Sequence, residues 1–310
     1  MFRLRSAPVR LFDHAVARAL PVVPRSIVGR VAAPYIAGAT LEDARRVVSE
    51  LNANGMSATV DVLGEEITHP ESAETIAAAY HEALAAISTD GLDANVSVKL
   101  TALGLHVDPE LCRALLTEVL RDASARKIFV RIDMEDSSTT DATLELYRSL
   151  REDGQDGVGI VLQAALRRTL GDIEALSDLR PSVRLCKGIY VEPSAIAFQE
   201  REVIRKSFVA CLDALVDAGC RVAVATHDEW LLGQTLDRIP RLEAAGYELQ
   251  MLLGVRVQRG RELVAAGHPL RIYVPYGQQW YEYSLRRLQE NPGVAGHVAK
   301  DMLGRLVPGR

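Results

Sequence analysis

Two adjacent arginines near the C-terminus, Arg286 and Arg287, are the residues whose types and spacing most directly suggest chemistry. Tyr283 stands three and four residues before them, and those separations bring side chains together on a helix surface. One aromatic ring and two guanidinium groups can therefore share a face, and arginine binds carboxylates and phosphates through paired hydrogen bonds. The alternative is a solvated helix end, where the helix dipole favours basic residues.

The elements that must position these residues alternate from residue 55 onward, with short β-branched runs between amphipathic helical patterns. Eight runs are predicted to form strands, over residues 56–64, 94–100, 127–135, 157–163, 182–188, 220–228, 247–254 and 269–277. The patterns between them predict helices such as 40–54, 71–87, 109–125, 140–152, 195–218 and 230–245. This alternation implies parallel strands that are buried on both faces. Eight such units over about 250 residues match an α/β fold of the (βα)8 TIM barrel class.

An open, doubly wound sheet is the rival architecture, and it normally carries a glycine-rich phosphate turn after an early strand. No GxGxxG pattern follows residues 56–64, and no GxxxxGK[ST] pattern occurs anywhere in the chain. The barrel is therefore the preferred architecture.

Polar residues close the predicted strands one after another: Asp61, Lys99, Asp133, Glu135, Gln163, Arg184, Lys187, Thr226, His227, Gln250 and Tyr273. The functional groups of such barrels lie at the mouth formed by the C-terminal ends of the strands. One polar residue in such a place is usually a solvated loop residue, but charged groups crowded around one rim need partners or ligands to offset their desolvation. Because the rim is rich in cations and hydrogen-bond donors, an anionic ligand is expected.

Metal binding is not expected, because His227 is the only histidine at a strand end and no HxH or HExxH pattern occurs. Lys187 has two alternatives, a Schiff base as in barrel aldolases and a contact to a phosphate or cofactor. The four cysteines show no CxxC spacing and are predicted to be buried thiols in a reducing cytosol, including Cys186 beside Lys187.

Composition narrows the class of protein. The 310 residues carry 36 basic and 41 acidic side chains, a net charge of −5 that gives no sign of nucleic-acid binding. No apolar run reaches the 18 or so residues of a membrane-spanning helix, so a soluble protein is expected. The cysteine pattern indicates the cytoplasm. Residues 1–39, rich in arginine, are predicted to be an N-terminal helical segment packed on a barrel of residues 40–310, with a targeting or membrane-surface segment as the alternative.

Seven motifs give a resemblance to a known family: VSVKLTALG, RIDMED, VLQAAL, RLCKGIYVEP, ATHD, QMLLGV and RIYVPYGQQWYEYSLRRLQEN. Over roughly residues 40 to 291 the chain resembles the flavin-dependent proline dehydrogenases, including the proline dehydrogenase domain of the proline utilisation A proteins. The resemblance implies a distorted (βα)8 barrel with FAD lying across the strand C-termini. It also implies a last helix that closes the mouth.

The resemblance implies roles for matching residues. Asp133 and Arg184 would lie in the catalytic neighbourhood, with Arg184 near the reactive edge of the flavin. The proline carboxylate would be held by Arg286 and Arg287 with help from Lys99, while Tyr273 and Tyr283 would pack on the proline ring. The matching cofactor contacts are Met134, Gln163, Arg184, Lys187, Gly188, Ile189, Thr226 and His227.

The implied reaction is oxidation of L-proline to 1-pyrroline-5-carboxylate by hydride transfer to flavin N5, the first step of proline degradation to glutamate. The implied electron acceptor is a membrane quinone, reached by peripheral contact with the inner face of the cell membrane. Tyr283 favours proline over hydroxyproline, because its ring would crowd a 4-hydroxyl group. Two alternatives stay open: a Schiff-base lyase or aldolase that acts on a small carboxylate through Lys187 or Lys99, and a barrel that binds its ligand without turnover. The oligomeric state is open.

Overall fold

Eight parallel strands form a closed barrel in the order β1 to β8, and β8 pairs with β1 to close it. The computed structural model describes residues 33–64, 67–281 and 284. The strands are β1 (Ser57–Val62), β2 (Ala94–Val98), β3 (Val130–Ile132), β4 (Val158–Gln163), β5 (Ser182–Cys186), β6 (Arg221–Ala225), β7 (Tyr247–Leu252) and β8 (Leu270–Tyr276). The predicted TIM barrel is confirmed, and all eight predicted strands are present.

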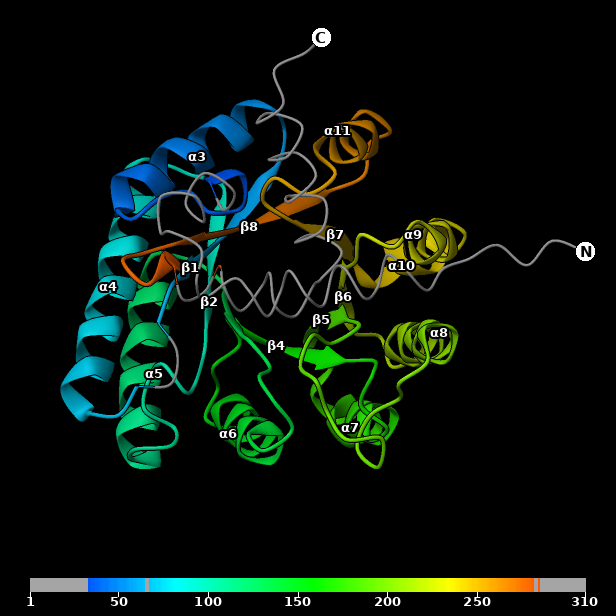
Figure 1. Ribbon diagram of the computed structural model, residues 1–310, viewed down its shortest axis with the longest axis horizontal. Helices are drawn as coiled ribbons and strands as arrows, with labels where there is room; N and C mark the ends of the chain where they lie inside the picture. The colour runs from blue at the N-terminus through cyan, green and yellow to red at the C-terminus, as the bar shows by residue number, and fades with distance from the viewer. Residues whose placement is uncertain (1–32, 65–66, 282–283, 285–310) are drawn as a thin grey trace, which may run out of the picture.

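Helices surround the barrel in the described part of the chain (Figure 1). They are α3 (Leu41–Ala53), α4 (Pro70–Thr89), α5 (Pro109–Ala125), α6 (Thr140–Glu152), α7 (Thr169–Leu176), α8 (Arg201–Asp217), α9 (Glu229–Leu236), α10 (Ile239–Ala245) and α11 (Val257–Ala265), with short 3-10 turns at Ala33–Tyr35 and Ser177–Leu179. Helix α3 precedes β1 and packs on the outer face of β1 and β8. It thus covers the seam where the first and last strands meet. No helix among residues 33–64 and 67–281 is long and apolar enough to cross a bilayer.

Local signals explain where several helices begin. Thr40 and Asp43 form a capping box at the start of α3, in which each side chain accepts a hydrogen bond from the backbone N–H of the other. Asp108 accepts from two backbone N–H groups at the start of α5, and Pro109 suits the first helical position because that position needs no N–H donor.

The predicted helix 230–245 is two helices, α9 and α10, and this part of the prediction is wrong. Pro240 lies in the first turn of α10. A proline inside a continuous helix would remove one hydrogen bond and clash with the preceding turn. The chain therefore ends α9 at Leu236 and starts a new helix.

Two other predicted elements are shorter than expected. Strand β3 covers Val130–Ile132 rather than 127–135, because Lys127 adopts a left-handed backbone conformation with φ of 58° and turns the chain before the strand. Helix α8 begins at Arg201 rather than 195. Residues 194–196 form a turn, and Ala197 pairs with Leu166 in an antiparallel bridge.

Apolar and polar side chains alternate along the strands. The residues that face the helices are aliphatic, as at Val96, Val98, Val130 and Ile132. The opposite face is polar, and its hydrogen bonds join strands that are not neighbours, such as Arg131 on β3 to Ser182 on β5. In a closed barrel such bonds run through the interior, so the interior of this barrel is a hydrogen-bonded network. Branched aliphatic side chains usually fill that space.

The N-terminal part of the predicted organisation lies mostly outside the described residues, as does the predicted last helix over the mouth. The division into a segment 1–39 and a barrel 40–310 therefore stays a prediction. Among residues 33–39, the backbone N–H of Ala37 donates to the carbonyl of Pro275 at 2.9 Å, which joins this segment to the end of β8.

The polar interior gives a stability prediction at Gly159 on β4. A Cβ atom there would lie 2.5 Å from Nη1 of Arg131 and 2.5 Å from the carbonyl oxygen of Ser182. We expect Gly159→Ala to lower the free energy of unfolding by about 1–3 kcal/mol in urea denaturation, since overpacking forces neighbours out of place. Gly171→Ala in α7 is the matched control, because its Cβ would meet nothing within 4 Å. This control is expected to raise stability by up to about 1 kcal/mol. Equal effects of the two changes would contradict the crowded interior.

Candidate active site

Asp133 lies at the centre of the candidate site, directly after β3. Its backbone N–H donates to the carbonyl of Val98 at 2.8 Å, which extends the pairing with β2 and turns the side chain into the barrel. Its Oδ1 accepts hydrogen bonds from Ser97 Oγ and from Arg184 Nη1, both at 2.6 Å. Its Oδ2 accepts from the hydroxyl of Tyr273 at 2.8 Å. One carboxylate therefore joins strands β2, β3, β5 and β8 at the mouth.

Lys99 lies beside this carboxylate. Its Nζ donates to both carboxylate oxygens of Asp61, at 2.9 and 3.0 Å, and to the hydroxyl of Tyr273 at 3.3 Å. The same nitrogen lies 3.7 Å from Oδ2 of Asp133. The Lys99 ammonium is thus shared by two acidic groups and a phenol.

Arg184 is held from two sides of the barrel. Its Nη1 pairs with Asp133, and its Nε donates to Oε1 of Gln250 at 2.6 Å. Its guanidinium carbon lies 5.2 Å from the ring centroid of Tyr273. The third nitrogen, Nη2, is buried and has no hydrogen-bond partner in the described part of the chain. A buried donor of this kind can bind an acceptor atom of a ligand.

The charges at the mouth stabilise one another. Burial of Asp133 favours its neutral form, but the positive charges of Arg184 and Lys99 outweigh burial and hold the pKa of Asp133 below its usual value. The site therefore presents an ionised carboxylate between two cations at neutral pH.

The loops after β3 and β4 carry a second group of predicted residues. Gln163, the last residue of β4, donates from Nε2 to the carbonyl of Glu135 at 2.7 Å. The Glu135 carboxylate accepts from the backbone N–H and the hydroxyl of Thr101. Met134 is buried between Asp133 and Glu135. These bonds fix the loop that follows β3.

Gly188 lies against Gln163. Its φ is +102°, and a Cβ atom built on it would come within 2.9 Å of Oε1 of Gln163. Both the backbone conformation and the close approach require glycine. Its neighbour Ile189 is partly exposed in the same loop after β5.

A third group of predicted residues lies in the loops after β5 and β6. Nζ of Lys187 lies 3.5 Å from Oδ2 of Asp228, a buried carboxylate that also pairs with Arg205 at 2.7 Å. The Oγ of Thr226 accepts from the backbone N–H of Asp228 at 3.1 Å. The cations of Arg205 and Lys187 hold the pKa of Asp228 below its usual value, although its burial opposes them.

His227 is held as a neutral ring. Its Nε2 accepts a hydrogen bond from the backbone N–H of Leu252 at 3.0 Å, so the proton of the neutral ring is on Nδ1. Burial, together with the charges of Arg256 and Lys187, lowers the pKa of His227 to about 4. The ring is therefore a neutral hydrogen-bond donor through Nδ1 at physiological pH.

The predicted residues thus fall into three outcomes. The structure brings Lys99, Asp133, Arg184 and Tyr273 into direct contact. It places the other predicted cofactor residues at the end of β4 or on the loops of the same mouth: Met134, Gln163, Lys187, Gly188, Ile189, Thr226 and His227. Tyr283, Arg286 and Arg287 lie outside the described residues.

Sequence reasoning missed several members of the interior network. Ser97 binds both Asp133 and Arg184, while Glu248 binds Gln250 and Arg271. The alternation of strand residues was the available signal, because each of these polar residues lies two positions before a predicted strand-end residue. Asp228 follows His227 directly and gave no such signal.

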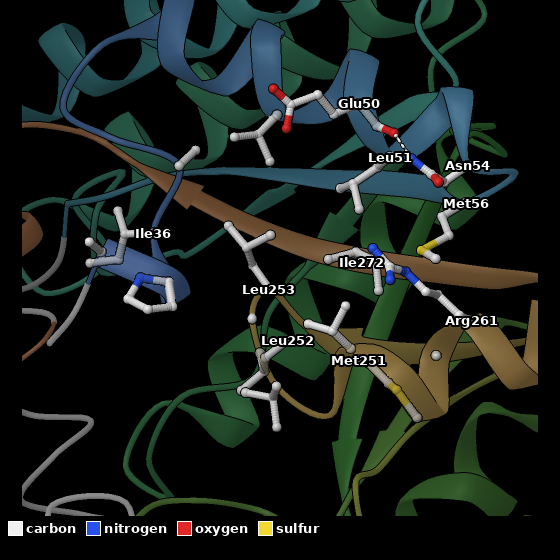
Figure 2. Close-up of a pocket in the computed structure, with 18 of the residues that line it drawn as sticks. Ile36, Glu50, Leu51, Asn54, Met56, Met251, Leu252, Leu253, Arg261 and Ile272 are labelled. Carbon is white, nitrogen blue, oxygen red and sulfur yellow. Dashed lines mark hydrogen bonds between the residues drawn. The ribbon is translucent and has the colours of Figure 1, made fainter. Parts of the chain in front are cut away.

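A cavity of 370 Å³ lies elsewhere, on the outer side of the barrel between α3 and α11. Figure 2 shows Leu51, Met56, Leu253 and Ile272 around it. The described residues that line the cavity include none of the predicted site residues. The cavity is therefore separate from the candidate site.

Comparison with known proteins shows the family of the chain. The chain matches the proline dehydrogenase family model over residues 44–300. It is 36% identical to proline dehydrogenase 1 of Bacillus subtilis over 271 residues, which cover 87% of this chain and 89% of the relative. It is 35% identical to the proline dehydrogenase of Deinococcus radiodurans over 279 residues, with 87% and 89% covered.

Solved structures show the same fold at lower identity. Proline utilization A from Bdellovibrio bacteriovorus superposes with a TM-score of 0.82 at 23% identity, over 91% of this chain and 37% of that chain. A variant of proline utilization A from Bradyrhizobium japonicum gives a TM-score of 0.74 at 22% identity, over 85% and 31%. This chain therefore spans about a third of those proteins. With the family model matched over most of its length, the chain belongs to the proline dehydrogenase family.

Proposed function

We propose that this protein oxidises L-proline to 1-pyrroline-5-carboxylate with FAD as its cofactor and passes the electrons to a quinone. The observation that carries the proposal is the buried cluster in which Asp133 binds Arg184 and Tyr273 and lies beside Lys99, at the barrel mouth of a chain in this family. Arg184 provides a fixed positive charge and the buried donor Nη2 for a cofactor. Lys99 and Tyr273 provide an ammonium group and an aromatic ring for an amino acid.

The substrate would be held by the cationic and aromatic members of the site. The Lys99 ammonium is fixed by Asp61 and by the Tyr273 hydroxyl, so it can bind a carboxylate without rearranging. The face of the Tyr273 ring would pack on the pyrrolidine ring. Arg286, Arg287 and Tyr283 are proposed to complete the clamp from the C-terminal part of the chain.

The residues present fit a flavin. Nη2 of Arg184 is a buried donor without a partner in residues 33–64 and 67–281, and the oxygens of an isoalloxazine ring are acceptors. Gly188 packs directly against Gln163 and so helps to hold this side chain, the proposed contact for the isoalloxazine edge. The Nδ1–H of His227 and the ammonium of Lys187 would contact ribose or phosphate oxygens. Met134, Ile189 and Thr226 would complete the walls.

When bound, FAD supplies a two-electron acceptor that takes the hydride from C5 of proline at N5. The other bond changes of this reaction take place in the proline itself. The nitrogen lone pair of proline forms the C=N bond as the C5–H bond breaks, and the remaining N–H proton is then released. Because the amine must be neutral to do so, activity should rise with pH. The fixed charge of Arg184 would favour the electron-rich reduced ring.

The proposed function includes an electron acceptor, a quinone in the cell membrane. Reoxidation by a membrane quinone would require peripheral contact of the protein with the inner face of the cell membrane, with residues 1–39 as the candidate contact segment. These residues would pack as a separate helical segment on the barrel of residues 40–310. The cellular location would then be the cytoplasm beside that membrane.

The Schiff-base alternative has no specific support in the geometry. The nucleophile of a Schiff base must be an uncharged amine. Lys99 contacts the carboxylate of Asp61, and Lys187 contacts that of Asp228. Each lysine is thus held in an ion pair, which the nucleophile of a Schiff base would have to leave.

An anaerobic titration tests the proposed function. The purified, FAD-loaded protein is expected to lose its flavin absorbance on addition of L-proline and to regain it with a menadione-type quinone. Proline binding without bleaching would indicate a barrel that binds its ligand without turnover. A colourless protein that borohydride links to a carbonyl substrate would indicate the lyase instead.

Removing the central carboxylate should impair the reaction. Asp133→Asn leaves Arg184 buried without its anionic partner, and its amide offers only one acceptor oxygen for the three donors that Asp133 now binds. We expect kcat/KM for proline to fall at least about 100-fold, since charged hydrogen bonds contribute roughly 1.5–3 kcal/mol each. Asp153→Asn is the control, because Asp153 forms a surface ion pair with Arg113 and is 58% exposed. Steady-state rates that match in the two variants would exclude the role proposed for Asp133.

The proposed carboxylate clamp gives a separate prediction. Arg286→Met and Arg287→Met are each expected to raise the apparent Kd for proline about 10- to 100-fold, because each loses a charged hydrogen bond to the carboxylate. Arg46→Met is the control, since Arg46 pairs with Glu50 on the exposed face of α3. Wild-type affinity in both clamp variants would show that the carboxylate is bound elsewhere.

A further inference from the structure

Gln250 reaches Arg184 across an intervening strand. Arg184 is on β5 and Gln250 is on β7, yet Oε1 of Gln250 lies 2.6 Å from Nε of Arg184. Strand β6 between them has Ala223 in register with Arg184 and Ala225 in register with Gln250. The small alanine side chains leave the space that the contact occupies.

The amide of Gln250 can have only one orientation. Its Nε2 donates to Oε1 of Glu248 at 2.5 Å, and its Oε1 accepts from Arg184. A guanidinium only donates and an ionised carboxylate only accepts, so a reversed amide would oppose donor to donor and acceptor to acceptor. Glu248 therefore determines which atom of Gln250 faces Arg184.

Glu248 is itself fixed in place by Arg271 on β8. Nε of Arg271 lies 3.0 and 3.1 Å from the two carboxylate oxygens of Glu248, and its Nη1 donates to the carbonyl of Ala58 at 2.6 Å. Burial opposes the ionisation of Glu248, but Arg271 and Gln250 hold its pKa below the usual value. A continuous chain of bonds thus runs from β1 and β8 through β7 to Arg184.

We propose that Gln250 and Glu248 are positioning residues that act through Arg184 and hold its guanidinium so that Nη2 stays available to the flavin. Asp133 binds Nη1 and Gln250 binds Nε, and two fixed nitrogens determine the plane and the rotation of a rigid fork. Without Gln250 the guanidinium can rotate about its bond to Asp133. The inference rests on the proposed function, because it assigns the two residues to the same site.

The test compares variants of the full-length, FAD-loaded protein. Gln250→Met keeps the size of the side chain but removes both hydrogen bonds. The double variant Gln250→Glu with Glu248→Gln exchanges the two groups, so that an acceptor again faces Arg184 and an amide again lies between the carboxylate and Arg271. Thr59→Val is the control, because it removes a buried interior hydrogen bond to Asn95 that does not involve Arg184.

The measurements are kcat and KM for proline, the flavin midpoint potential by photochemical reduction, and thermal denaturation. We expect Gln250→Met to lower kcat about 10- to 100-fold, the loss that one charged hydrogen bond predicts, while KM changes less than about 3-fold. Its midpoint potential should fall by about 30 mV for each tenfold loss of preference for the reduced flavin. The exchange variant should recover most of the lost kcat. If Gln250 had a purely structural role, Gln250→Met would lower the melting temperature but leave kcat and the flavin midpoint potential unchanged.

Two results would overturn the inference: a kcat and potential of Gln250→Met equal to those of Thr59→Val, or an exchange variant no better than Gln250→Met. If Gln250→Met does not fold, Glu248→Gln is measured in its place and judged by the same criteria. This variant no longer fixes the orientation of the Gln250 amide, but it keeps an acceptor for Arg271. Failure of the proposed function gives a different result, because proline would then bleach neither the wild type nor Thr59→Val. The photochemical potentials of the FAD-loaded variants would still decide the positioning role.

Discussion

The buried ion pair between Asp133 and Arg184 is the interaction on which the rest of the site depends. Leaving either charge buried without its partner would cost several kcal/mol, so the two must be placed together as the barrel closes. Asp133 directly follows β3 and Arg184 is on β5. These two strands do not pair, and the bond between the side chains spans the interior. Tyr273, Ser97 and Gln250 then have their positions set by hydrogen bonds to one or the other.

The sequence predicted the barrel because hydrophobic periodicity is a local property. Eight β-branched runs between helical patterns are visible without any knowledge of the contacts. The errors have local steric causes, namely Pro240 at the split between α9 and α10 and the left-handed Lys127 before β3. The strand ends also indicated the mouth, since parallel strands of one barrel end on one side. Which ends meet across the barrel depends on strand register and closure, and no local pattern encodes that. The contact between Arg184 and Gln250, separated by 66 positions, is an example.

The loops of the mouth are tied to one another by side chains. Glu135 joins the loop after β3 to Thr101 in the loop after β2, and Glu192 in the loop after β5 accepts from the backbone N–H and the hydroxyl of Ser137. His227 after β6 accepts from the backbone of Leu252 at the end of β7. Loops are ordinarily the most mobile part of a barrel, and these bonds give the rim a fixed geometry. A rim of fixed geometry favours a reaction in which two reactants must approach each other in one orientation.

The polar interior also explains why one donor of Arg184 stands out. Most polar groups around it are satisfied, and Asp133, Gln250, Glu248 and Arg271 each have at least two partners. A buried donor without a partner costs about 1–3 kcal/mol, which is a considerable part of the stability of a domain. Nε of Arg131 is also buried without a partner in the described residues. Nη2 of Arg184 differs because it belongs to the cluster at the barrel mouth, where a ligand can supply the acceptor. If that ligand is the proposed cofactor, the group that weakens the ligand-free barrel would stabilise the loaded one. Cofactor binding and folding stability would then be linked through Arg184.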